Sequence, residues 1–257
     1  MNSSRIPLRF VQLFFISAIT MVFKACTPPN DRPCLKSSGM EDSLSVELPP
    51  FEKLYLGEHL KYVLIQDTVD RVYLKGGINL LNFIDVYSDV SSSSLTIENK
   101  NRCRFLRSRT NDIFVRIHFT DLSEIIFNGS ETLVNEGVLQ MEKLKLITSG
   151  SSGSVYLNIQ SNEVHCINDF GWSDVILSGE CSFFRSETYG NQWIDTRELL
   201  VENDIQIISN AGTVSKINAQ GVSFKVELGG VGDMWYYGQP ASIDKKEYNS
   251  GRLINKN

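Results

Sequence analysis

The amino-acid sequence predicts an all-β protein, a single-stranded parallel β-helix of about six coils with an N-terminal strand-rich segment covering one end. Three observations predict it. Apolar residues recur about every 20 residues from Ile125 onward, a turn rich in Gly, Ser or Asn precedes each recurrence, and no proline lies between Pro50 and Pro240. Proline removes a backbone hydrogen-bond donor, so its absence suits a long uninterrupted ladder.

The repeat can be aligned on one apolar residue per coil. These anchors are Leu133, Val155, Val175, Ile194, Val214 and Met234, separated by 22, 20, 19, 20 and 20 residues. This period is too short for a propeller blade and lacks the leucine-rich pattern, but it fits one coil of a parallel β-helix. Coils stacked roughly 4.8 Å apart would place the anchors in one inward-facing ladder. Stacking would then supply the core that a single coil lacks.

The chain before the repeat is predicted to contain short strands and one helix. Alternating apolar residues across Phe51–Leu74, Leu95–Ile97 and Ile113–Phe119 are typical of strands. Within Asn79–Tyr87 the apolar residues instead have helical spacing. We expect this N-terminal part to cap one end of the rod.

The first 25 residues are typical of a secretory signal, with two early arginines, the apolar stretch Phe10–Phe23 and a small residue, Ala25. The apolar stretch is shorter than the ~20 residues that a membrane-spanning helix needs. Cys26 follows, and Phe23-Lys24-Ala25-Cys26 resembles the bacterial lipoprotein signal, in which the cysteine is acylated. Lys24 departs from that pattern, and a plain cleaved signal or an uncleaved anchor are the alternatives.

Residues 26–50 are predicted to be a Pro/Ser-rich tether, residues 51–253 the folded domain and residues 254–257 a short tail. The chain has 25 basic and 30 acidic residues. Removal of residues 1–25 takes away three basic residues and no acidic one, which leaves 22 against 30 and a net charge of −8. A domain this acidic argues against nucleic acid as its main partner.

The order of motifs in the folded domain resembles the head GIN domain family of putative auto-transporter adhesins, which is common in envelope proteins of the Bacteroidota. The resemblance covers about residues 51–253. It rests on Leu95-Thr-Ile97, Val115-Arg-Ile117, the ladder of Gly/Ser turns and the closing segment Gly230–Pro240 with its Tyr-Tyr-Gly-x-Pro.

The resemblance implies a right-handed β-helix and an exported, often lipid-anchored protein, here an outer-membrane lipoprotein whose lipid is carried by Cys26. It names no active site. Glu131, Ser173 and Gln192 stand where the family's turns usually have a second glycine, so these turns are expected to be less regular.

Residues that could carry chemistry are few. His59, His118 and His165 are isolated, so we predict no metal site, and no Cys-x-x-Cys motif indicates zinc or redox chemistry. The remaining cysteines are expected to be inert free thiols, although three disulfide pairings are open to them: Cys34, Cys103, Cys166 and Cys181. The basic stretch from Lys100 to Arg109 is interpreted as a solvated loop, and binding of phosphate or an anionic glycan is the alternative. No cofactor is predicted.

Aromatic residues give the better functional hypothesis. Residues next to an inward anchor face outward in a strand, which places Trp193 in a polar column beside Asp174 and Thr213. Trp172 lies at the same corner, and Trp235 is expected to face outward from its own coil. Exposed indoles beside a carboxylate suit stacking on sugar rings or a protein contact. The alternative is that these rings pack under a loop or cap.

These observations favour a non-catalytic, lipid-tethered envelope module that presents a lateral surface to a glycan or a surface protein. An enzyme acting on polysaccharide is an alternative. General acid–base cleavage needs two carboxylates about 5–9.5 Å apart, and the pairs Asp174/Asp195 and Glu180/Glu198 are the candidates. No basic residue lies in register for a lyase. A periplasmic scaffold or stress-sensing partner is a third possibility, and the sequence leaves the oligomeric state open.

Overall fold

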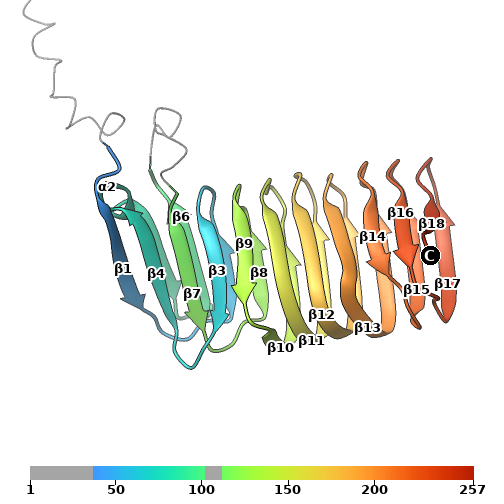
Figure 1. Ribbon diagram of the computed structural model, residues 1–257, viewed down its shortest axis with the longest axis horizontal. Coiled ribbons are helices and arrows are strands. Elements are labelled where there is room, and N and C mark those ends of the chain that lie inside the picture. Colours follow the sequence, from blue (N-terminus) through green and yellow to red (C-terminus); the bar gives the residue numbers. More distant parts are fainter. Residues whose placement is uncertain (1–36, 102–111) are drawn as a thin grey trace, which may run out of the picture.

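The computed structural model describes residues 37–101 and 112–257 and shows strands stacked side by side along a rod (Figure 1). The only helix among these residues is a single turn, α2 (Ile78–Leu81). Parallel pairing links one coil to the next, and the chain makes about seven turns where the sequence predicts about six. The all-β, parallel β-helical fold predicted from the repeat is therefore confirmed.

The strands, in chain order, are β1 (Glu41–Glu47), β2 (Lys53–Leu56), β3 (Lys61–Gln66), β4 (Arg71–Gly77), β5 (Ile84–Asp89), β6 (Ser94–Asn99), β7 (Phe114–Phe119), β8 (Glu124–Phe127), β9 (Thr132–Glu136), β10 (Leu139–Ile147), β11 (Ser154–Asn168), β12 (Asp174–Thr188), β13 (Trp193–Ser209), β14 (Ser215–Asn218), β15 (Ser223–Leu228), β16 (Met234–Tyr237), β17 (Ser242–Glu247) and β18 (Leu253–Asn255).

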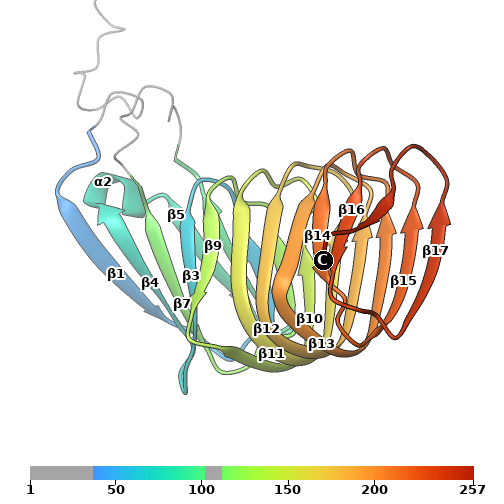
Figure 2. The ribbon, with the colours of Figure 1, turned by 45° about the vertical axis from the view of Figure 1, so that its right-hand side comes forward.

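Each coil contributes to two strand layers, which curve into one another at the lower bend in Figure 2. One layer runs in the order β1-β4-β7-β3-β9-β11-β12-β13-β14-β16-β18. The other runs β5-β6-β2-β8-β10-β11-β12-β13-β15-β17. The long strands β11, β12 and β13 pass through both layers, so about 20 residues complete a coil.

Side chains alternate between the core and solvent because successive residues of a strand point to opposite faces. Five of the six anchors predicted from the repeat are buried and stack in the core: Leu133, Val155, Val175, Ile194 and Met234. Stacking of the coils buries one continuous core along the rod.

The sixth anchor, Val214, is wrong by one residue. Val214 is only half-buried, whereas Ser215 is 5% exposed and pairs with Met234. The pairing Asp195↔Lys216 also places Ser215, not Val214, beside Ile194. A small buried hydroxyl occupies this core position, so a search for apolar residues selects the neighbouring valine. One coil beyond the sixth anchor, Leu253 pairs with Met234.

The N-terminal part differs from the prediction in two places. The helix expected over Asn79–Tyr87 is limited to α2, and β5 follows as a hairpin partner of β6. In β5, Val86 and Tyr87 favour an extended backbone, and antiparallel pairing outweighs the helical spacing. The start of the fold also differs, because β1 lies inside the predicted tether and pairs antiparallel with β4 over seven residues.

The coils do not stack in chain order near this end. Strands β2 and β3 lie between the coil formed by β6 and β7 and the coil formed by β8 and β9. Strands β1 and β4 then cover β7 with antiparallel pairing. This arrangement confirms a strand-rich cap at the N-terminal end of the rod.

Stacked turns close each coil at one corner. A Cβ added to Gly153 would lie 2.0 Å from the backbone oxygen of Glu131, so the turns approach too closely for a side chain there. In two of the turns that lack a second glycine, a polar side chain points inward instead. Gln192 and Ser173 are fully buried, and Gln192 Nε2 donates to Ser173 Oγ at 3.0 Å. This hydrogen bond joins the corners of two successive coils.

Candidate functional site

Aromatic and cationic side chains gather on the outward side of the layer formed by β13, β14, β16 and β18. We call this surface the tryptophan face and define it by Trp193, Arg197, Lys216, Trp235, Tyr237 and Lys256. The parallel register builds it, because Lys216 pairs with Asp195 on one side and with Trp235 on the other. Residues far apart in the sequence therefore meet at neighbouring coils.

Lysines and indoles alternate along this face. Lys216 Nζ lies 5.3 Å from the ring centroid of Trp193 and 6.0 Å from that of Trp235. Lys256 Nζ lies 4.4 Å from the same Trp235 ring. These distances are within the range of cation–π attraction, which holds an ammonium group over an aromatic ring. The order across the face is thus Trp193, Lys216, Trp235, Lys256.

Arg197 lies at an irregularity in β13, where its pairing with β12 shifts by one residue. Its guanidinium donates Nε and Nη2 hydrogen bonds to Asp195 at 2.9 and 2.7 Å, and its backbone N–H donates to Asp195 Oδ1 at 3.1 Å. The guanidinium carbon also lies 5.9 Å from the ring centroid of Tyr237. Burial raises the pKa of Asp195, but the hydrogen bonds and charge of Arg197 outweigh it and hold that pKa below its usual value.

Of the four predicted binding residues, Asp174 and Trp193 lie side by side, Trp172 lies in a turn and Trp235 lies two coils from Trp193. Asp174 pairs with Trp193 in the neighbouring coil, and Trp172 is 68% exposed in the turn before β12. Trp235 lies two coils beyond Trp193 and is linked to it through Lys216. Trp193 and Trp235 are half-buried.

The expectation that Thr213 stands beside Trp193 is wrong, because the register of this coil is shifted by one residue. Val214 takes that position, since Ser215 stacks on Ile194. The same shift explains why Lys216 is missed in the sequence: alignment on Val214 assigns Ser215 to the outward column that Lys216 occupies. Lys256 is missed because it belongs to the coil beyond the sixth anchor.

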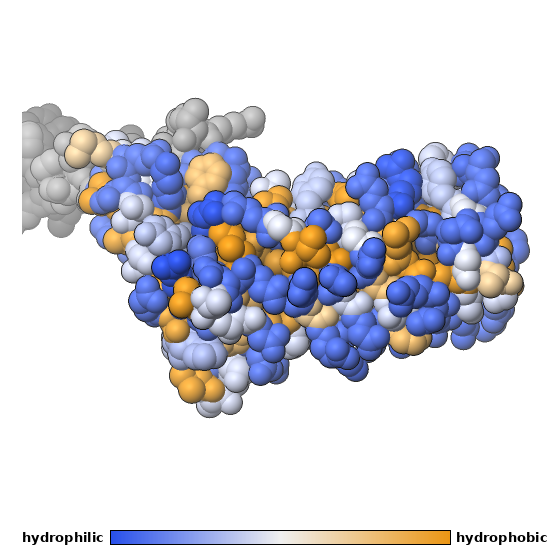
Figure 3. Space-filling view, turned by 60° about the horizontal axis from the view of Figure 1, so that its bottom comes forward, coloured by the Kyte–Doolittle hydropathy of each residue, from blue (hydrophilic) through white to orange (hydrophobic). Residues whose placement is uncertain are grey.

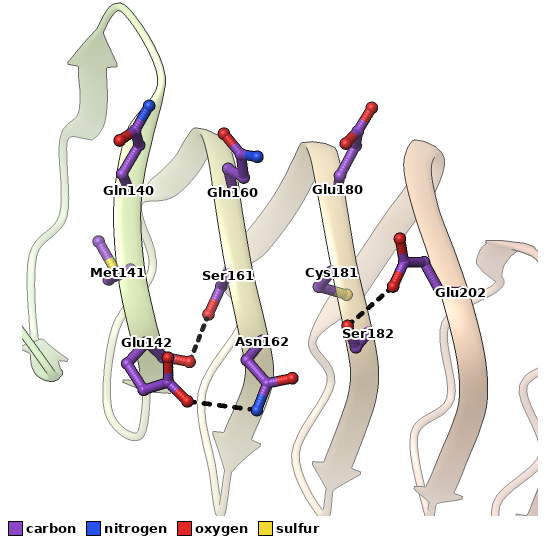
Figure 4. A pocket seen from close by; sticks show the side chains of 10 residues that line it. All are labelled: Gln140, Met141, Glu142, Gln160, Ser161, Asn162, Glu180, Cys181, Ser182 and Glu202. Carbon is purple, nitrogen blue, oxygen red and sulfur yellow. Dashed lines mark hydrogen bonds between the residues drawn. The ribbon is translucent and has the colours of Figure 1, made fainter.

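A polar groove runs across four coils where β10, β11, β12 and β13 bend from one layer to the other, with a cavity volume of about 600 Å³ (Figure 4). Amides, hydroxyls and three carboxylates line it: Gln140, Met141, Glu142, Gln160, Ser161, Asn162, Glu180, Cys181, Ser182 and Glu202. Glu202 accepts a hydrogen bond from Ser182 at 2.9 Å. No aromatic side chain is among these lining residues, which distinguishes the groove from the tryptophan face.

Figure 3 brings the lower side of the rod forward and shows hydrophobic side chains in separate patches among hydrophilic ones.

The profile of the family described as "Putative auto-transporter adhesin, head GIN domain" matches residues 50–240. The chain belongs to this family. The resemblance noted from the closing segment and the turn ladder is therefore confirmed. A search of curated proteins found no match.

Solved structures share the fold of this head GIN domain. A putative adhesin from Bacteroides fragilis NCTC 9343 is 19% identical with a TM-score of 0.76, over 84% of this chain and 97% of that one. A putative adhesin from Parabacteroides merdae ATCC 43184 is 12% identical with a TM-score of 0.60, over 86% and 98%. A putative lipid binding protein from Parabacteroides distasonis ATCC 8503 is 13% identical with a TM-score of 0.61, over 85% and 98%.

Membership of the family supports an envelope-associated, non-catalytic binding module. Within the described residues of the head GIN domain, no helix is long and apolar enough to cross a membrane. The predicted lipidation site Cys26 and the predicted signal at residues 1–25 lie outside the described residues. Cys34, Cys103 and most of the basic stretch, from Arg102 onward, lie outside them as well.

In each carboxylate pair considered for an enzyme, the two residues lie on the neighbouring strands β12 and β13, offset by two residues along the strand. Asp195 is held by Arg197 through several hydrogen bonds, so its oxygens are engaged at the strand irregularity. Glu180 pairs with Leu200 and lines the groove, whereas Glu198 pairs with Ser178.

The histidines and the described cysteines have local structural roles. His118 Nδ1 lies 2.8 Å from Asp67 Oδ2, and His165 Nε2 lies 3.0 Å from Glu187 Oε1. Over residues 37–101 and 112–257, no cluster of three His, Cys, Asp or Glu residues could hold a metal ion. Cys166 and Cys181 are buried free thiols, and burial raises the pKa of each to about 12.

Proposed function

We propose that this protein is an exported, lipid-tethered module of the cell envelope that binds a glycan through the tryptophan face, without catalysing a reaction. Family membership supports the envelope location and the binding role. The single observation that carries the glycan assignment is the pair of indoles, Trp193 and Trp235, bridged by Lys216 on one lateral surface.

This combination matches the chemistry of a sugar. The C–H face of a pyranose ring is apolar and stacks on an aromatic ring, while its hydroxyl groups need charged or polar partners. On the tryptophan face the ammonium groups of two lysines lie over the indoles, and the guanidinium of Arg197 lies near the Tyr237 ring. The rings are anchored on strands, which preorganises them and reduces the entropy lost on binding.

A glycan array with purified protein tests this proposal. We expect the double variant Trp193→Ala/Trp235→Ala to lose binding to the glycans that the unmodified protein recognises. Tyr87→Ala is the matched control, because Tyr87 is an exposed aromatic residue on β5, near the other end of the rod. Full retention of binding by the double variant, with the native circular dichroism spectrum, would contradict the assignment to this face.

The tether is proposed from the sequence alone. Residues 1–25 would direct export, and acylated Cys26 followed by the segment up to residue 40 would hold the domain near the membrane. One acyl chain gives only marginal membrane binding, whereas several give a stable anchor. Cys26→Ala should move the protein from the membrane fraction to the soluble fraction of the envelope. Unchanged partitioning of that variant would rule out the lipid anchor.

A further inference from the structure

We propose that the tryptophan face selects anionic glycans, whose carboxylate or sulfate groups bind Lys216 and Lys256 while a sugar ring contacts the indoles. This inference rests on the proposed glycan-binding function and specifies its ligand class. It follows from the charges on the face and from the way in which the indoles hold them.

The two lysines are the uncompensated charges of this surface. Neither forms an ion pair within 4.0 Å with any carboxylate of the described residues. Asp195 lies near enough for Lys216 to influence its pKa, but both of its oxygens are hydrogen-bonded to Arg197. Asp233 accepts a hydrogen bond from the backbone N–H of Arg252. Two ammonium groups therefore remain available to a ligand.

The indoles keep these ammonium groups in place. Both lysines lie over Trp235, and Lys216 also lies over Trp193. A lysine side chain loses considerable rotamer entropy when a ligand fixes it, and contact with a ring reduces that loss.

The geometry favours an extended polymer over a small ion. Lys216 and Lys256 belong to coils two steps apart, which corresponds to roughly 9.6 Å along the rod. A linear acidic polysaccharide that follows the rod axis can therefore place one anionic group at each lysine and a ring over the aromatic surface between them. A small anion can bind a lysine but has no ring that could contact the indoles at the same time.

The polar groove does not compete for such a ligand. The whole chain has a net charge of −5, and the polar groove carries Glu142, Glu180 and Glu202 without an ion-pair partner among the described residues. An anionic polymer is repelled by that groove. At an ionic strength of about 0.15 M the Debye length is about 8 Å, so direct contacts with the two lysines persist while distant repulsion is screened.

The test uses three probes: polygalacturonate, which carries carboxylates, dextran sulfate, which carries sulfates, and uncharged dextran. Binding is measured by biolayer interferometry at 50 and 500 mM salt. We expect at least one anionic probe to bind about tenfold or more tightly than dextran and to weaken with salt. Comparison of the two anionic probes shows which group is preferred. Lys216→Gln and Lys256→Gln should each weaken that binding about tenfold, as expected for loss of one charged hydrogen bond.

Lys225→Gln is the matched control, because Lys225 lies on β15 in the same coil as Lys216 but in the other layer, and it should change the affinity less than twofold. The inference would be overturned if dextran bound as tightly as the anionic probes or if neither anionic probe bound. Unchanged affinity in the double variant Lys216→Gln/Lys256→Gln would also overturn it. Tryptophan-dependent binding of a neutral glycan alone would refute the anionic preference and leave the proposed function standing. Binding of an anionic probe that survives Trp193→Ala/Trp235→Ala would refute the proposed function instead.

Discussion

Two adjacent isoleucines on β13 provide a direct test of the stacked core. Ile207 is 3% exposed and lies in register between Ser186 and Val226 of the neighbouring coils. Ile207→Ala removes three buried carbon atoms, and at about 0.8 kcal/mol per buried methylene the lost transfer free energy is about 2.4 kcal/mol. The cavity left in a packed interior adds to this, so we expect the free energy of unfolding to fall by about 3–4 kcal/mol.

Ile208→Ala is the internal control. Ile208 is half-buried and faces outward between Glu187 and Glu227. The same change of residue type in the same strand loses the same strand propensity, so the difference between the variants reports burial alone. We expect Ile208→Ala to cost about 1 kcal/mol or less. Urea denaturation followed by circular dichroism measures both values, and equal slopes show that the same unit unfolds. Equal costs, or a larger cost for Ile208→Ala, would refute the assignment of the two strand faces.

Three further predictions concern a turn glycine, the stability of the fold at acidic pH and the buried thiols. Gly153→Ala should reduce the free energy of unfolding by about 3 kcal/mol, measured in urea, because its Cβ would overlap a backbone oxygen of the preceding turn. The pKa of Asp195 is lower in the folded state than its ordinary value of 3.8, so it contributes stability above pH 3.8 that is lost as the pH falls through the folded pKa. Asp195→Asn should therefore be less stable than the unmodified protein at pH 7, and urea titrations from pH 7 to pH 2 should show the gap closing; a constant gap would contradict this. The folded protein should protect Cys166 and Cys181 from a thiol reagent at pH 8, with modification following unfolding, because both thiols are buried and their pKa values are raised to about 12.

The architecture was predictable because a solenoid repeats the same physical requirement in every coil. Each coil needs an inward apolar residue and a turn that tolerates close stacking, so the pattern recurs and five anchors could be located. Val214 was mislocated because the core accepts a small buried hydroxyl at Ser215, which an apolar criterion cannot recognise. The helix prediction was wrong because it used only the local spacing of apolar residues. The backbone there is instead determined by antiparallel pairing of β5 with β6, which lies outside the segment considered.

The candidate site was predictable only where the register was right. Strand alternation alone placed Asp174 and Trp193 side by side. The lysines that define the chemistry were hidden, since in a parallel β-helix a one-residue error exchanges the inward and outward residues of that coil. Lys216 therefore became visible only once the pairing of β14 with β13 and β16 was known.

The irregularity at Arg197 links the register of β12 and β13 to the arrangement of the tryptophan face. Between the pairs Ile176↔Asp195 and Ser178↔Glu198, β13 has one residue more than β12, as in a β-bulge. A bulge bends the strand and redirects a side chain, and it needs a partner for the backbone groups that it leaves unpaired. Asp195 supplies that partner by accepting the backbone N–H of Arg197, and the same carboxylate holds the guanidinium, which extends toward Tyr237. One buried carboxylate thus stabilises the bulge and accepts hydrogen bonds from the guanidinium of Arg197. Because Asp195 is occupied in this way, Lys216 in the next coil is left without an ion-pair partner between two indoles.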